Sequence, residues 1–134
     1  MKLRYSKRIS GILFWAWLVF ILIMTLIPKL PVDTDSDKSL FLGLIRLDYL
    51  VHFGVFGILG FFLGIWQLEK IKRKKSISFI FLFGLLFAYF DEFLQIFIEG
   101  RKYNIFDFYF NAIGFIMGLV FIIILNKKAI FSKF

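Results

Sequence analysis

Apolar residues gather in four long runs along the chain, separated by short polar segments. The runs cover residues 9–27, 49–66, 76–98 and 106–125. At about 1.5 Å per residue, a helix of such a length reaches or nearly reaches across the roughly 30 Å hydrocarbon core of a bilayer. A backbone in lipid must satisfy its own hydrogen bonds, and no run alternates as the strands of a membrane β-barrel do. The pattern predicts an all-α, polytopic membrane protein with four transmembrane helices.

Composition agrees with a single membrane domain over residues 1–134. The chain is 60% apolar, against roughly 45–50% in an ordinary soluble domain. It contains no Cys and a single His, so disulfides, thiolate metal sites and multi-histidine sites within one chain are excluded. We therefore expect the lipid bilayer to be the main surroundings of this protein.

The positive charge of the chain lies at particular helix ends. Of its 17 Lys and Arg residues, twelve lie in the N-terminal segment, the 67–75 loop and the C-terminal segment, together with one acidic residue, Glu69. The opposite side carries five basic and eight acidic residues. Positively charged loops mark the cytoplasmic side, so we predict an N-in/C-in topology. No soluble fold remains to bind nucleic acid, which we exclude as a partner.

With this topology, residues 28–48 form the main extracytoplasmic loop. Three aspartates alternate within residues 32–37 and resemble a calcium loop. The segment lacks the Gly at the sixth position and the closing Glu of such a loop, so we expect a solvated acidic loop. Residues 40–45 are apolar but too short to span, and we expect them to lie in the interface or to re-enter slightly.

A set of polar residues lies at one depth, at the extracytoplasmic ends of the second, third and fourth helices. Two pairs, Asp48 with His52 and Asp107 with Asn111, each stand four residues apart on one helical face. The third helix and the loop after it contribute Asp91, Glu92, Gln95 and Arg101. Ionisable side chains are costly within a membrane and usually mark a site or a tight polar contact.

Small residues indicate that these polar faces point into the bundle. The second helix carries Gly54, Gly57, Gly60 and Gly64. The fourth helix has a G-x-x-x-G motif at Gly114 and Gly118, which begins three residues after Asn111. Such spacing favours close packing between membrane helices. We therefore predict that Gly114 and Gly118 serve helix packing next to the polar site.

The order and spacing of these residues resemble the VanZ-like family of small polytopic bacterial membrane proteins. The matching pattern is Asp48…His52, Glu92-x-x-Gln95, Arg101, Asp107-x-x-x-Asn111, Gly114 and Gly118, from about residue 48 to 118. Tyr49 stands where the family often has Lys, and Phe56 where it often has Tyr. The family's namesake is associated with resistance to the glycopeptide teicoplanin. The resemblance thus implies a multi-pass protein of the bacterial plasma membrane with a cell-envelope role. It also implies a link to antibiotic resistance.

Our main functional hypothesis is a site that binds or acts on an amphiphilic cell-envelope component, lipid-linked or glycopeptide-like. Its candidate catalytic residues are His52, Glu92 and Asp107, as general base and acid. Its candidate ligand-binding residues are Asp48, Gln95, Arg101 and Asn111. Arg101 suits an anionic head group because its guanidinium matches phosphate or carboxylate. The sequence leaves open whether any catalysis occurs.

Three alternatives use the same residues. The polar groups can serve as structural bonds between helices, each worth roughly 0.6–2 kcal/mol. The pairs this interpretation predicts are Asp107 or Glu92 with Arg101, Gln95 with Asn111, and His52 with Asp48. A divalent metal bound by Asp48, His52, Glu92 and Asp107 is a lesser alternative, and the main hypothesis expects no metal and no cofactor.

The last alternative is a non-enzymatic subunit or assembly factor of a larger envelope complex, with partner membrane or envelope proteins. A transporter or channel is disfavoured, because the cytoplasmic halves of the predicted helices are almost purely apolar.

Overall fold

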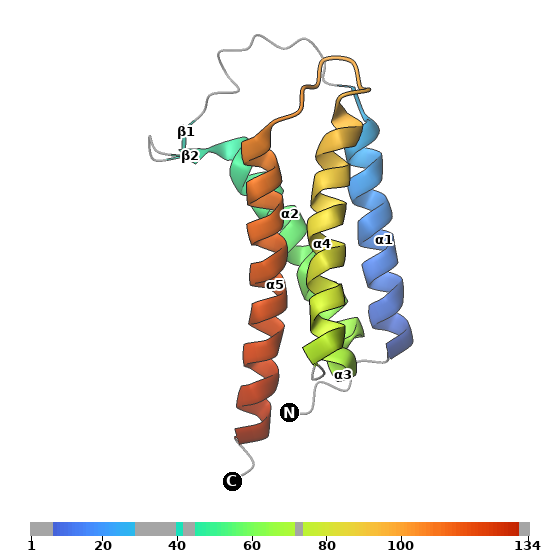
Figure 1. Ribbon diagram of the computed structural model, residues 1–134, viewed down its shortest axis with the longest axis vertical. Coiled ribbons are helices and arrows are strands. Elements are labelled where there is room, and N and C mark those ends of the chain that lie inside the picture. The colour runs from blue at the N-terminus through green and yellow to red at the C-terminus, as the bar shows by residue number, and fades with distance from the viewer. Residues whose placement is uncertain (1–6, 29–39, 42–44, 72–73, 132–134) are drawn as a thin grey trace.

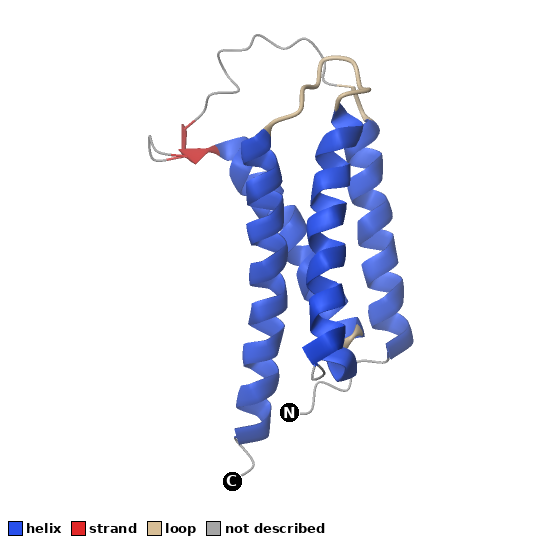
Figure 2. Ribbon diagram, viewed as in Figure 1, coloured by secondary structure: helices blue, strands red, loops and turns tan. Residues whose placement is uncertain are grey.

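The computed structural model describes residues 7–28, 40–41, 45–71 and 74–131. Four long helices form an up-and-down bundle (Figure 1), and Figure 2 shows how little of the described chain lies outside helices. The helices are α1 (Lys7–Leu26), α2 (Leu47–Trp66), α4 (Lys74–Gln95) and α5 (Ile105–Phe131). Each is long and apolar enough to span a membrane. The prediction of an all-α protein with four such helices is confirmed.

Helix ends differ from the predicted ones by a few residues. α2 begins at Leu47 rather than residue 49, and α5 continues to Phe131 rather than ending at residue 125. α4 ends at Gln95, three residues early, and the chain then tightens into turns that bond each amide to the carbonyl three residues back. Gly100 reverses the chain with a φ of 75°, which favours glycine. A short helix, α3 (Leu68–Ile71), lies within the predicted 67–75 loop.

The segment before α2 contains a small hairpin that the apolar pattern did not predict. Strand β1 (Leu40–Phe41) pairs antiparallel with β2 (Ile45–Arg46), and β2 leads directly into α2. The predicted acidic loop falls on residues 29–39, which lie outside the described part of the chain. The depth of residues 40–45 relative to a membrane stays a prediction.

Helices α2 and α5 make the most extensive contact in the bundle, and glycine permits it. A Cβ at Gly60 would overlap the backbone of Phe115, and one at Gly114 would overlap the carbonyl of Phe53. At Gly118 a Cβ would overlap the carbonyl of Gly57. Both glycines of the G-x-x-x-G motif therefore lie where the two backbones meet.

Helix α1 completes the bundle by packing against α2 and α4. Its Phe14 is buried with Phe56 of α2 and Phe115 of α5, and the Trp17 indole donates to the carbonyl of Val55 at 2.9 Å. α1 begins and α5 ends at the same end of the bundle (Figure 1). Which side of the membrane that end faces stays a prediction from the charge distribution.

Candidate functional site

The predicted polar site is a buried cluster at the end of the bundle where α4 ends and α2 and α5 begin. Glu92 and Asn111 are both fully buried, Gln95 is 4% exposed and Asp107 is 8% exposed. His52 is partly buried, with 21% of its side chain exposed. Three helices thus bring together five of the seven predicted site residues.

Asn111 lies at the centre of the cluster and joins the His52 imidazole to the Glu92 carboxyl group. Its Nδ2 donates to Glu92 Oε1 at 3.2 Å, and its Oδ1 lies 3.0 Å from His52 Nδ1. The opposite amide orientation would place an oxygen against the Glu92 carboxylate, so the hydrogen-bond network fixes the assignment. Asn111 Oδ1 then accepts a proton from His52 Nδ1. The Nε2 atom of a neutral His52 therefore carries the free lone pair.

The two carboxylates each keep a free oxygen. Glu92 Oε1 accepts from Gln95 Nε2 at 3.1 Å as well as from Asn111. Glu92 Oε2 and Asp107 Oδ1 are buried and have no hydrogen bond of ordinary length among the described residues, while Asn104 is a weaker donor to both carboxylates. Asp107 Oδ2 lies 3.9 Å from His52 Nε2. His52, Glu92 and Asp107 each offer one metal-binding atom, and these three atoms lie within 4.8 Å of one another.

The Arg101 guanidinium is anchored to the end of α1 and to Gln95. Its Nε donates to the Ile27 carbonyl at 3.0 Å and its Nη2 to the Met24 carbonyl at 2.9 Å. Its Nη1 lies 3.5 Å from Gln95 Oε1. The guanidinium thus satisfies carbonyls at the end of α1, which have no partner within that helix. The predicted pairing of Arg101 with Glu92 or Asp107 is wrong for the described residues.

Asp48 is engaged outside the cluster. Its carboxylate accepts two bonds from Arg46, at 3.1 Å from Nε and 2.6 Å from Nη2. It also accepts from the Tyr49 amide at 3.0 Å, in the first turn of α2, where the helix dipole favours an anion. The predicted bond between Asp48 and His52 is replaced by the bond from His52 to Asn111.

The predicted pairing of Gln95 with Asn111 is also wrong. Both side-chain amides donate instead to the same oxygen of Glu92. These two hydrogen bonds to Glu92 Oε1 lower the cost of burying the carboxyl group.

A buried contact between α1 and α4 was not predicted from the sequence. The Thr25 hydroxyl is hydrogen-bonded to Asp91 Oδ1 and also lies 2.9 Å from the Ile21 carbonyl. Thr25 is 4% exposed and Asp91 is 2% exposed. The available signal was a hydroxyl near the end of the first apolar run, at the same depth as Asp91 on the third.

Replacing Thr25 by Val is expected to destabilise the protein by about 1–3 kcal/mol, because a buried carboxyl loses its hydrogen-bond partner while the side-chain shape is kept. The free energy of unfolding, measured by denaturant titration in detergent micelles, checks this. Thr25→Ser keeps the hydroxyl and should remain close to wild type. Equal stability of the Val variant and wild type would show that Asp91 does not depend on Thr25.

A cavity of about 280 Å³ opens beside the cluster, between α1, α2 and the end of α4. One part of its wall is apolar and includes Phe20, Met24 and Val55. Its polar lining residues are Thr25, His52, Asp91, Gln95 and Arg101. His52 lines this cavity, whereas Glu92 and Asp107 do not.

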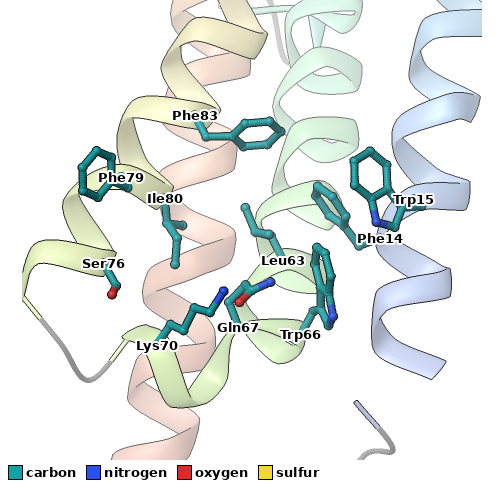
Figure 3. A pocket seen from close by; sticks show the side chains of 10 residues that line it. All are labelled: Phe14, Trp15, Leu63, Trp66, Gln67, Lys70, Ser76, Phe79, Ile80 and Phe83. Carbon is teal, nitrogen blue, oxygen red and sulfur yellow. The ribbon is translucent and has the colours of Figure 1, made fainter. Parts of the chain in front are cut away.

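A second cavity, of about 450 Å³, lies at the opposite end of the bundle (Figure 3). Phe14 and Trp66 stack there with ring centroids 5.3 Å apart, and Lys70 and Gln67 extend along one side. It shares no residue with the cavity beside His52. No carboxylate or imidazole lines it.

Four helices of transmembrane length around a buried imidazole–carboxylate–amide cluster define a multi-pass α-helical membrane protein. The chain belongs to the VanZ/LLP1 family, whose family model matches residues 11–126. This range includes every residue of the cluster and confirms the resemblance inferred from the polar pattern. No curated protein and no solved structure is significantly similar to the chain.

Proposed function

We propose that this protein binds an amphiphilic cell-envelope component, lipid-linked or glycopeptide-like, in the cavity beside His52. The observation that carries the proposal is that apolar side chains and polar or ionisable side chains line the same cavity. The positive-inside charge distribution supports placing the cavity at the extracytoplasmic face of a bacterial plasma membrane. Family membership supports the same cell-envelope setting.

The two parts of the wall suit the two parts of an amphiphile. Phe20, Met24 and Val55 offer apolar surface for an acyl or prenyl chain, and burying such a chain gains roughly 25 cal/mol per Å². Arg101 uses three of its N–H groups for bonds to Met24, Ile27 and Gln95. A guanidinium has five such donors, so two remain, together with its positive charge, for an anionic head group.

Binding is better supported than turnover. Of the three candidate catalytic residues, His52 lines the cavity, while Glu92 and Asp107 are buried and do not line it. A head group in the cavity would therefore meet His52 first.

The test is ligand binding by the protein in lipid nanodiscs, measured by native mass spectrometry. The probes are a polyprenyl phosphate and a lipoglycopeptide of the teicoplanin type. Val55→Phe fills the apolar wall and should weaken binding of the accepted probe at least about tenfold, or ~1.4 kcal/mol.

The matched control is Ile58→Phe, which adds the same ring at a side chain on α2 that is 40% exposed and does not line the cavity. This variant should bind like wild type. Failure of wild type to bind either probe, or equal loss in both variants, would contradict the proposal. A stoichiometric membrane protein that co-purifies in place of a ligand would favour the assembly-factor alternative.

A further inference from the structure

We infer that His52, Glu92 and Asp107 form a binding site for one divalent transition-metal ion. The inference is independent of whether the neighbouring cavity holds an amphiphile. It departs from the expectation that the site holds no metal. Of the four possible metal ligands named from the sequence, it uses three. Asp48 is left out because Arg46 occupies its carboxylate.

The first ligand atom is His52 Nε2. Asn111 Oδ1 accepts the proton of His52 Nδ1 at 3.0 Å, and Asn111 is itself oriented by its bond to Glu92. Imidazoles that bind metals almost always donate their other N–H to an oxygen acceptor, which fixes the tautomer and the ring orientation. Asn111 supplies that acceptor and leaves Nε2 free to coordinate.

The other ligand atoms are buried carboxylate oxygens that accept no hydrogen bond of ordinary length from the described residues, Asn104 being only a weaker donor to the two carboxylates. Glu92 Oε1 is held by two side-chain amide donors, while Oε2 has no bond of ordinary length. Asp107 Oδ1 is likewise buried without such a bond. The two residues are 0% and 8% exposed, and burying anionic oxygen without compensation is costly. A cation between these oxygens removes that cost.

An ion pair with a protonated His52 explains less of the geometry. His52 Nε2 is 3.9 Å from Asp107 Oδ2 and His52 Nδ1 is 3.7 Å from Glu92 Oε1, and both distances are too long for a hydrogen bond. Such a pair also leaves Glu92 Oε2 without a hydrogen bond of ordinary length. One dication instead balances both carboxylates and uses the lone pair of a neutral imidazole.

The ligand set indicates which ions fit. One imidazole nitrogen with two carboxylate groups is a mixed set that suits Zn²⁺ or Mn²⁺ better than Ca²⁺ or Mg²⁺. Three protein ligands are also the number typical of zinc sites that keep a position for water or substrate. The three come from α2, α4 and α5, so an ion here would also tie these helices together.

The test uses the full chain, without a histidine tag, in lipid nanodiscs after treatment with chelator. Zn²⁺ or Mn²⁺ alone is added at micromolar concentration, and bound metal is measured after desalting. We expect one ion per chain for wild type and for Asp48→Asn, which neutralises a carboxylate outside the trio. Glu92→Gln and Asp107→Asn should each weaken metal binding at least about tenfold.

A second readout needs no variant. His52 is the sole histidine of the chain, so its ¹⁵N resonances are assigned without ambiguity. Addition of Zn²⁺ should shift Nε2 while Nδ1 keeps its proton. Absence of stoichiometric metal in wild type together with unchanged ¹⁵N shifts would overturn the inference, as would equal binding by all variants. Neither result bears on lipid binding in the cavity, which the Val55→Phe comparison measures separately.

Discussion

Replacing Gly118 by Ala is expected to lower the free energy of unfolding by about 1–3 kcal/mol, the usual cost of overpacking a tight contact. The added methyl group would overlap the carbonyl of Gly57 on α2. Backbone is unable to rotate away as a flexible side chain does, so α2 and α5 must separate. Denaturant titration in detergent micelles measures the change.

Gly54→Ala is the matched control, because a Cβ there meets nothing within 4 Å. The same Gly to Ala change on α2 should leave stability unchanged or raise it, since Ala favours helix by about 1 kcal/mol over Gly. If both variants are equally stable, the close approach of α2 and α5 is not a determinant of the fold. If both variants are equally destabilised, the loss of stability does not come from the contact at Gly118.

The glycine contact also sets the geometry of the polar cluster. His52 on α2 and Asn111 on α5 meet at 3.0 Å, close to the contact of Gly114 with the Phe53 carbonyl. A separation of these helices therefore reaches the site directly. We expect Gly118→Ala to weaken metal binding in proportion to its loss of stability, while Gly54→Ala leaves metal binding intact.

The sequence predicted the helices and the depth of the site because both follow from the apolar pattern. Runs of about 20 apolar residues define the transmembrane helices. Because successive helices cross the membrane in opposite directions, residues as distant in sequence as His52 and Asp107 come to the same depth. Spacing of four residues correctly put Asp107 and Asn111 on one face of α5. The two glycines of the G-x-x-x-G motif were predicted at a helix contact for the same reason.

The pairing within the site was not predictable in this way. Periodicity gives the face of each helix but not its rotation relative to a neighbour, and a side-chain bond depends on shifts of about 1 Å. Asn111, rather than Asp48, faces His52 because α2 and α5 approach along glycine. Arg101 turns back to α1 because Gly100 reverses the chain. Neither interaction has a local signature in the sequence.

Asn111→Leu is expected to have the largest effect of any single substitution in the cluster, about 3 kcal/mol of lost stability. It removes the donor to Glu92 Oε1 and the acceptor of His52 Nδ1 together. Glu92 then keeps the bond from Gln95 and the weaker contact with the Asn104 backbone, in a position with no exposure to water. His52 also loses the bond that fixes its tautomer, so the free lone pair is no longer confined to Nε2.

Gln67→Met is the control, because it replaces a side-chain amide in which Oε1 is buried without a described partner. Removing such a group is expected to be neutral or slightly stabilising. Denaturant titration and ¹⁵N spectra of His52 should separate two contributions in Asn111→Leu, the loss of stability and the loss of a single tautomer. A stable Asn111→Leu protein with an unchanged His52 spectrum would show that Glu92, rather than Asn111, organises the cluster.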